Sequence, residues 1–205
     1  MKKVGLILTL LIGTGCITYA QNVAIGTQLW MNKNLDVSSF RNGDPIPQAK
    51  TNEEWKKAGI NKQPAWCYYE NDPANGVKYG KLYNWYAVSD PRGLAPVGYH
   101  IPSNAEWTKL EDYLGSEAGK KMKSPRGWNE NGNDNNSSGF SGLPGGTRDY
   151  DGPFGSDIGD SGYWWSSTEG GTYGAWYRYL DSSDGTVGRS SGNENLGFSV
   201  RCLRD

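Results

Sequence analysis

The segment of residues 99–114, YHIPSNAEWTKLEDYL, places the strongest constraint on how this chain folds. Ser103 and Glu106 have the spacing of a capping box, in which two residues bond each other's backbone N–H groups and start a helix. Gly115 follows at the position where a helix commonly ends. The apolar residues between these signals recur at helical spacing and predict one buried face: Trp107, Leu110 and Leu114. We therefore expect an amphipathic helix here, with much of the chain packed around it.

His100, just before this helix, is the only histidine of the chain. A catalytic histidine needs a nucleophile or a carboxylate within reach. The sequence contains no Gly-x-Ser-x-Gly elbow that would supply an activated serine. We expect His100 to be a structural residue where the helix begins, and Glu106 to serve the helix cap.

Periodicity and turn residues predict further elements. Thr51 and Glu54 form a second capping box, which predicts a short helix ending at Gly59. Residues 79–88 carry an apolar stripe at helical spacing, and residues 116–123 favour one or two further helical turns. Alternating or short apolar runs predict strands at residues 24–31, 35–40, 65–69, 163–167, 175–180 and 196–203.

The first twenty residues have the features of an export signal. Lys2 and Lys3 precede an apolar run, residues 4–12, that is too short to span a bilayer. Small residues then predict cleavage after Ala20. Removal of residues 1–20 as a signal peptide leaves residues 21–205, a length that fits a single domain.

Lipid attachment at Cys16 is the alternative to a free mature chain. Gly13 weakens this alternative, because a branched aliphatic residue usually stands three positions before a lipidated cysteine. No later stretch is long and apolar enough to predict a transmembrane helix. We expect a secreted or cell-surface protein.

The charge balance excludes two classes of partner. Without Lys2 and Lys3 the chain keeps 19 of its 21 basic residues against 22 acidic ones, a net charge of −3 with no basic run. Nucleic acids and anionic membranes both select clustered Lys and Arg, so neither is expected as a partner. The 29 glycines, 9 tryptophans and 13 tyrosines indicate a loop-rich fold that uses large rings in its core and on its surface.

Cys67 and Cys202 are the two cysteines that remain after the predicted cleavage. An even pair in an exported chain predicts one disulfide, which would close a long loop and add a few kcal/mol of stability in the chain-entropy model. Two buried free thiols are the alternative.

Six ordered blocks of the sequence resemble a known family. The blocks are IGTQLWMNKNL, YGKLYNW, GYHIPSNAEW, GFSGLPGGTR, YWWSSTE and GFSVRCLRD. They resemble the Fibrobacter succinogenes major paralogous domain family of exported bacterial proteins, and the likeness extends from Ile25 to Asp205. A looser similarity links residues 79–88, 99–107 and 197–201 to the formylglycine-generating, sulfatase-modifying fold.

This resemblance implies an α+β, C-type-lectin-like architecture. Such a fold has two main helices, a small twisted antiparallel sheet, long glycine-rich loops and terminal strands that lie near each other. A Cys67–Cys202 bridge is compatible with that arrangement. Members of the family often carry a further cysteine before the GYHIP block, where this chain has Ala95 and Pro96, so no second disulfide is expected.

Calcium is the one metal that the sequence leaves open, and no other cofactor is expected. A single histidine and a paired cysteine do not provide the usual zinc ligands. Calcium instead takes carboxylate, amide and carbonyl oxygens. Its candidate ligands lie in a glycine-rich stretch without the full EF-hand spacing: Asp149, Asp151, Asp157 and Asp160.

Enzymatic activity is not expected. The formylglycine-generating enzymes use reactive cysteines, and neither Cys67 nor Cys202 lies in a segment that matches their active-site motif. A glycoside hydrolase would need two facing carboxylates, and a chain with 22 acids always offers some such pair.

Six aromatic residues gather within residues 164–179: Trp164, Trp165, Tyr173, Trp176, Tyr177 and Tyr179. In an alternating strand some of them, about half, must face inward as core. The rings that face outward would give a ligand large contact area at low entropic cost. Lectin-like folds bind through their C-terminal loops, so the resemblance supports a ligand face in this region. The residues predicted to form it are Arg148, Asp149, Asp151, Trp164, Trp165, Tyr173, Trp176 and Tyr177.

We therefore expect an exported, non-enzymatic binding or adhesion module that recognises a glycan or a surface protein through this C-terminal loop region. One alternative is an enzyme that acts on polysaccharide, with two carboxylates across a cleft. The other is a passive structural component of an envelope assembly, with an extended apolar interface. The sequence does not specify the oligomeric state.

Overall fold

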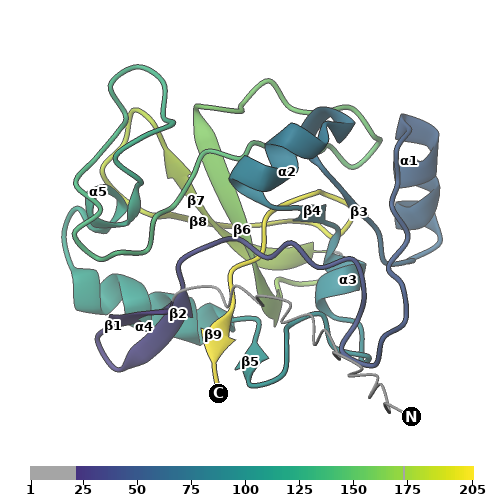
Figure 1. The fold of residues 1–205 in the computed structure, drawn as a ribbon, viewed down its shortest axis with the longest axis horizontal. Helices are drawn as coiled ribbons and strands as arrows, with labels where there is room; N and C mark the ends of the chain where they lie inside the picture. The colour runs from purple at the N-terminus through teal and green to yellow at the C-terminus, as the bar shows by residue number, and fades with distance from the viewer. Residues whose placement is uncertain (1–21, 173) are drawn as a thin grey trace, which may run out of the picture.

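A computed structural model describes residues 22–172 and 174–205 of the chain. The predicted signal peptide, with its alternative lipid site Cys16, lies outside the described residues, and so does Tyr173. The fold combines helices with small antiparallel sheets, as expected for the α+β class (Figure 1). Within the described ranges no helix is long and apolar enough to cross a membrane.

Helices and strands alternate irregularly along the chain. The helices are α1 (Asn52–Ile60), α2 (Pro73–Tyr79), α3 (Trp85–Val88), α4 (Asn104–Leu114) and α5 (Ala118–Met122), with a 3₁₀ turn at Tyr69–Asn71. The strands are β1 (Asn22–Ile25), β2 (Gln28–Met31), β3 (Trp66–Cys67), β4 (Leu82–Tyr83), β5 (Tyr99–His100), β6 (Ser161–Glu169), β7 (Gly174–Asp181), β8 (Gly188–Asn193) and β9 (Leu203–Arg204).

The strands form three small sheets, with the orders β1-β2-β9-β5, β3-β4 and β6-β7-β8. The last segment, residues 197–204, contacts all three of them. Phe198 bridges β4, Ser199 bridges β6, and Leu203 pairs with β2. Because this segment changes partner every few residues, the strand predicted at residues 196–203 is realised only as the short β9 and single bridges.

Both predicted capping boxes are present. The hydroxyl of Thr51 accepts from the Glu54 N–H at 3.1 Å, and the hydroxyl of Ser103 accepts from the Glu106 N–H at 3.3 Å. Gly115, at a φ of 68°, ends α4. The helices predicted at α1, α4 and α5 are therefore confirmed, and the apolar face of α4 is buried: Trp107, Leu110 and Leu114.

Two strand predictions in the N-terminal part are wrong. Residues 24–31 form a β-hairpin instead of one strand, since Gly26 adopts a φ of +61° and the chain reverses. Ile25 and Gln28 then face each other across the turn. Residues 35–40 contain only a single bridge, because they run past the sheets without a partner strand.

The helix predicted over residues 79–88 is also wrong. Gly80, at a φ of +77°, ends α2, and a Cβ there would lie 2.9 Å from a backbone carbonyl oxygen. Leu82 and Tyr83 follow as the buried strand β4. Asn84 then accepts a hydrogen bond from a backbone N–H and caps α3. The helical spacing of the rings thus comes from two helices on either side of a strand.

β6 and β7 confirm the strands predicted at residues 163–167 and 175–180, but β8 has no counterpart in the sequence predictions. Its sequence, GRSSGN, contains no apolar residue for a periodicity argument to use. Tyr179 of β7 pairs directly with Gly188 of β8. A Cβ at Gly188 would lie 2.0 Å from the Tyr179 ring, so this strand pairs because glycine leaves room for the ring.

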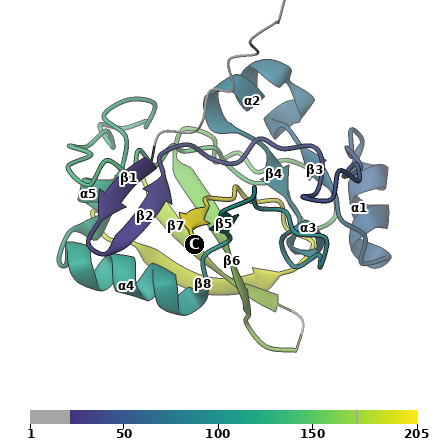
Figure 2. The same ribbon diagram turned by 60° about the horizontal axis from the view of Figure 1, so that its bottom comes forward.

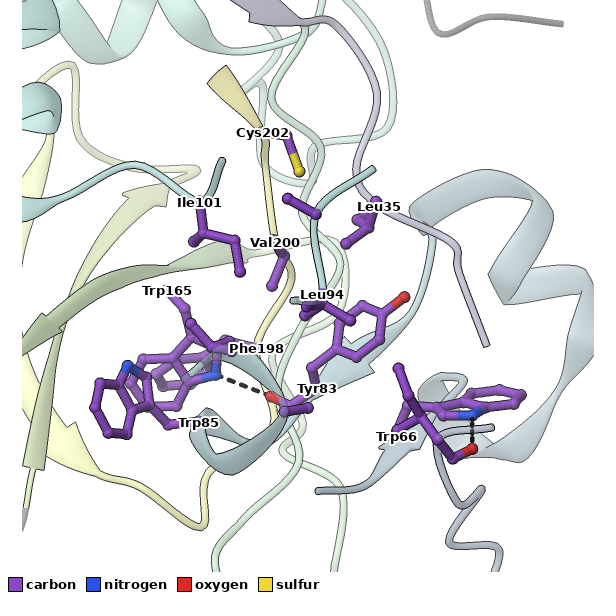
Figure 3. Packing of buried hydrophobic residues seen from close by; sticks show 14 of the residues in the cluster. Leu35, Trp66, Tyr83, Trp85, Leu94, Ile101, Trp165, Phe198, Val200 and Cys202 are labelled. Carbon is purple, nitrogen blue, oxygen red and sulfur yellow. Dashed lines mark hydrogen bonds between the residues drawn. The ribbon is translucent and has the colours of Figure 1, made fainter. Parts of the chain in front are cut away.

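Large rings fill the core (Figure 3). Phe198 lies between the three sheets, with its ring centroid 4.4 Å from that of Trp165. Several buried indole N–H groups find backbone partners: Trp165 donates to the Tyr83 carbonyl at 2.8 Å, and Trp66 donates to the Ile46 carbonyl at 2.8 Å. The indole N–H groups of Trp30 and Trp107 are buried without a partner among the described residues. The core is therefore apolar and hydrogen-bonded at most, but not all, of its indoles.

The predicted disulfide is not formed: Cys67 and Cys202 are both free, buried thiols. Cys67 pairs with Leu82 of β4, whereas the C-terminal segment meets β4 at Phe198. Three residues lie between Phe198 and Cys202, so in an extended chain Cys202 lies about 13 Å from the point of contact with β4, farther than the Cα separation of a disulfide. The two thiols belong to different core clusters, so the alternative of two free thiols describes this structure.

Figure 2 shows the hairpin of β1 and β2 beside α4, with β9 and β5 next to the hairpin. β9 is the neighbour of β2 in the sheet, so the first and last strands of the described chain share one sheet. This arrangement brings the hairpin turn, the start of α4 and the last residues of the chain to the same place.

Candidate functional site

Arg148, Trp164 and Trp165 are fully buried, which corrects the prediction that they belong to a ligand face. The Arg148 guanidinium donates to three carbonyl oxygens, those of Ala49 and Thr51 at 2.7 Å and of Gly152 at 2.8 Å. Such an arginine holds loops together and offers no surface to a ligand. The two tryptophans lie on opposite faces of β6 and pack in different core clusters, so both faces of this strand are covered.

The four aspartates proposed as calcium ligands do not converge. Asp149 and Asp151 are exposed in a turn. Asp157 instead faces inward and accepts hydrogen bonds from the Thr147 N–H and hydroxyl. Nowhere in residues 22–172 and 174–205 do three Asp, Glu, His or Cys side chains form a group that could hold a metal ion.

Trp176 and Tyr177, two predicted ligand residues, lie on opposite faces of β7, as consecutive residues in a strand do. Trp176 shares the α4 side with Arg178, and the Arg189 guanidinium lies 4.0 Å from its ring centroid. Tyr177 lies on the other side. The predicted set is therefore not one surface.

Three tyrosines form a continuous aromatic surface on that other side, here called the tyrosine face: Tyr163, Tyr177 and Tyr179. All three are partly exposed. Tyr163 stands directly opposite Tyr179 across β6 and β7, with ring centroids 5.9 Å apart in a stacked arrangement. Tyr177 lies 6.1 Å from Tyr163 and 6.2 Å from Tyr179.

β8 forms the floor of the tyrosine face. Gly188 and Gly192 lie under the rings of Tyr179 and Tyr177, where a Cβ would come within 2.0 Å and 3.1 Å of ring atoms. Ser190 stands between the two glycines, opposite Tyr177. Tyr177 and Tyr179 therefore lie against backbone, and Tyr163 stacks on both Tyr179 and the buried Phe198, whose ring centroid lies 5.1 Å away. The tyrosine face meets solvent through the partly exposed portions of the three rings.

Polar groups border the tyrosine face at one end. Burial, only partly offset by hydrogen bonds from Thr147, raises the pKa of the Asp157 carboxyl. Burial also raises the pKa of the neighbouring Tyr163 hydroxyl to about 12, helped by the negative charge of Asp157. At neutral pH the tyrosine hydroxyl thus keeps its proton and can donate.

Sequence reasoning named Tyr177 and included Tyr179 among the clustered aromatic residues, but it missed Tyr163. The signal was available in the period-2 alternation of β6 and β7, which groups residues 163 and 165 on one face and residues 175, 177 and 179 on the facing strand. The pairing register that brings Tyr163 opposite Tyr179 depends on the tertiary structure, and the sequence of neither strand alone predicts it.

A second site lies between the hairpin turn, α4 and β9, and is here called the hairpin groove. Its volume is about 570 Å³, and it is lined by Thr27, Gln28, Leu29, His100, Glu106, Lys109, Leu203, Arg204 and Asp205. Gln28 donates to the Glu106 carbonyl at 3.0 Å and ties the turn to α4. No serine or cysteine lines the groove in the part of the chain that the structure describes.

His100 bridges two carboxylates in this groove. Its Nδ1 lies 2.8 Å from Oδ1 of Asp205, and its Nε2 lies 2.9 Å from Oε1 of Glu106. Burial lowers the pKa of His100, but the two carboxylates raise it by more, so the net shift is upward. The geometry agrees with a structural role for His100 where α4 begins; the sequence had no signal for Asp205 as its second partner.

The comparisons with known proteins give one finding. The family model described as Fibrobacter succinogenes major domain matches residues 23–204. No curated protein and no solved structure matches the chain. The match covers the tyrosine face and every residue that lines the hairpin groove except Asp205.

Proposed function

The chain belongs to the Fibrobacter succinogenes major domain family, and from this premise we propose that it is an exported, non-enzymatic module that binds glycans through its tyrosine face. The observation that carries the proposal is the cluster of Tyr163, Tyr177 and Tyr179 on the glycine floor of β8. Flat aromatic rings suit sugars, which present apolar C–H faces edged by hydroxyl groups.

The polar border of this face supports the same ligand class. Two carboxylates next to the rings provide acceptors: that of Asp157, and that of Asp181, which accepts from the Ser161 hydroxyl at 3.1 Å. Pockets that recognise small polar ligands commonly combine such apolar surface with a few placed polar groups. A protein loop is the second ligand that this face would suit, because partly exposed tyrosines are common in protein interfaces.

We also propose that the architecture is C-type-lectin-like. The small antiparallel sheets, the two capped helices and the first and last strands in one sheet support it. In this architecture the tyrosine face would lie in the C-terminal half, where such folds bind ligands.

The two alternatives find less support. A glycoside hydrolase needs a carboxyl group whose pKa is raised so that it can donate a proton. Glu106 and Asp205 both line the hairpin groove. Burial acts to raise the pKa of Glu106, but the bonds from Ser103 and His100 outweigh this effect, so the pKa is lowered. The pKa of Asp157 is raised, but this carboxyl faces inward and accepts a hydrogen bond from the Thr147 N–H. A passive structural component would need an extended apolar interface, whereas the large exposed apolar residues are scattered: Ile60, Val77, Val97, Tyr113 and Tyr150.

The test is a glycan array probed with the mature chain and three variants. Tyr179→Ala removes one ring, and Ser190→Glu adds a charged side chain to the floor without removing a ring. We expect both to lose the glycans that the wild type binds. Tyr150→Ala, at an exposed ring in a loop, is the matched control and should bind as the wild type does.

Two results would overturn the proposal: a wild-type chain that binds no glycan on the array, or glycans bound equally by the wild type, Tyr179→Ala and Ser190→Glu. Mass spectrometry of the mature N-terminus tests the proposed export. Gln21 as the first residue supports cleavage after Ala20, a lipid-modified Cys16 supports anchoring, and an intact Met1 would contradict both.

A further inference from the structure

The hairpin groove contains two cations that no carboxylate neutralises. Lys109 of α4 and Arg204 of β9 both line it, and both side chains are exposed. Neither forms an ion pair within the described residues. The two acids that line the groove, Glu106 and Asp205, are each bonded to His100.

His100 therefore cancels much of the negative charge in the groove. An imidazole donates from both nitrogens only in its protonated form, and both nitrogens here face carboxylate oxygens. With His100 protonated, its charge offsets part of the negative charge of Glu106 and Asp205. The cations of the groove that have no carboxylate partner among the described residues are Lys109 and Arg204.

The groove continues past Lys109 to an exposed ring. A smaller hollow of about 380 Å³ shares Lys109 and the turn residues with the groove and ends at Tyr113. The Tyr113 side chain is 65% exposed, and its ring lies over Gly26, where a Cβ would come within 3.0 Å. Lys109 and Tyr113 are four positions apart on α4 and so lie on the same helix face.

The backbone around the groove favours a compact ligand over an extended peptide. β2 and β9, which supply Leu29 and Leu203, are interior strands of the sheet and pair on both sides. The groove therefore offers no free strand edge to which a peptide could add a strand. Recognition must come from side chains: two cations and one aromatic ring.

We propose that the hairpin groove binds an acidic oligosaccharide, with a sugar carboxylate between Lys109 and Arg204 and a sugar ring against Tyr113. The groove lies on the α4 side of the molecule. The tyrosine face lies on the other side of the β6-β7-β8 sheet. The site does not depend on the tyrosine face, and the two can be tested separately.

The experiment is calorimetric titration of the mature chain with tetragalacturonic acid at low salt and pH 6, and with its methyl ester, which has the same rings without the charges. We expect the acid to bind and the ester not to bind. Lys109→Gln and Arg204→Gln should each weaken binding about tenfold, as expected for one charge-assisted contact. Tyr113→Ala should also weaken it.

Matched controls make the outcome decisive. Lys56→Gln changes an exposed helical lysine on α1 that forms no ion pair with another described residue, and it should bind as the wild type does. Tyr179→Ala should also retain binding, which separates this site from the tyrosine face. All the groove variants change exposed side chains, so their melting temperatures should equal that of the wild type.

Equal binding of the acid and its ester would overturn the proposal, as would wild-type affinity in both Lys109→Gln and Arg204→Gln. Tetraglutamate serves as the acidic peptide. If it binds as tightly as the sugar acid, the groove selects polyanions in general and the assignment to an oligosaccharide is wrong.

Discussion

Buried arginines hold the loops of this protein in place through hydrogen bonds to backbone and side-chain oxygens. Arg148, Arg178 and Arg201 are all fully buried, and only Arg178 bonds a carboxylate, that of Glu111. Arg201 donates to the Asn34 side chain at 2.7 Å and to the Met31 carbonyl at 3.0 Å. Neutral oxygen acceptors therefore take the hydrogen bonds of this buried guanidinium. These bonds tie distant loops to the last segment of the chain.

We expect Arg201→Met to destabilise the protein by about 3–5 kcal/mol, because several buried acceptors lose their donor at once. Chemical denaturation measures the change. Arg126→Met, at an exposed arginine, should change the free energy of unfolding by less than about 0.5 kcal/mol. A similar small loss in Arg201→Met would show that water replaces the guanidinium.

His100 should make stability depend on pH. Its folded pKa is raised by Asp205 and Glu106 despite the opposing effect of burial. A raised folded pKa adds stability below the unfolded pKa and loses it as the pH rises through the folded value. We therefore expect a higher melting temperature at pH 6 than at pH 8.5, and a smaller difference in His100→Gln. An unchanged difference in that variant would show that the bridge does not stabilise the fold.

Among the elements, α4 connects the hairpin groove to the β6-β7-β8 sheet, whose opposite side carries the tyrosine face. Arg178 of β7 donates to Glu111 and to Asn104 on this helix, so one face of α4 is bonded to the sheet while its groove face meets the hairpin. The Ser103 cap positions the first turn of α4, and Glu106 belongs both to the cap and to the His100 bridge.

Loss of the cap should therefore affect more than the helix end. We expect Ser103→Ala to cost about 1 kcal/mol of stability and to weaken the pH dependence of melting, because Glu106 loses the partner that orients it. Ser116→Ala, just beyond the helix, is the control and should show neither effect. Normal pH dependence in Ser103→Ala would show that the cap and the bridge act independently.

β8 depends on its glycines more than on its side chains. Gly188→Ala should destabilise the protein by about 1–3 kcal/mol, the usual range for overpacking, because the new methyl group would overlap the Tyr179 ring. Denaturant unfolding measures this loss. Ser191→Ala, on the other face of the same strand, should have little effect, and equal losses in the two variants would argue against this packing.

For the whole molecule, the free thiols of Cys67 and Cys202 mean that non-covalent contacts, among them the pairing of β2 with β9, join the N-terminal and C-terminal parts of the described chain. Burial raises the pKa of Cys67 to about 11 and that of Cys202 to about 12, so both thiols should be unreactive in the native state. We expect iodoacetamide to modify neither thiol in the folded protein and both after unfolding without a reductant. Intact mass reports the result, and a chain that resists alkylation until a reductant is added would contain the disulfide after all.

Local features of this fold could be predicted from the sequence because their causes are local. The two capping boxes, the end of α4 at Gly115 and the existence of β6 and β7 follow from residues within a few positions of each other. The predictions failed where one residue changed the path of the chain. Gly26 turned one strand into a hairpin, and Gly80 ended a helix early.

The sites were decided by tertiary structure. The tyrosine face needs the register of β6 against β7 and the glycines of a strand with no hydrophobic pattern. The hairpin groove joins residues near positions 27, 100, 109 and 205, and no periodicity relates them. The sequence by itself determined the family, the fold class and the capped helix around which the chain is built. Only the folded chain decided which rings are exposed and which charges meet, because those depend on contacts between residues far apart in the sequence.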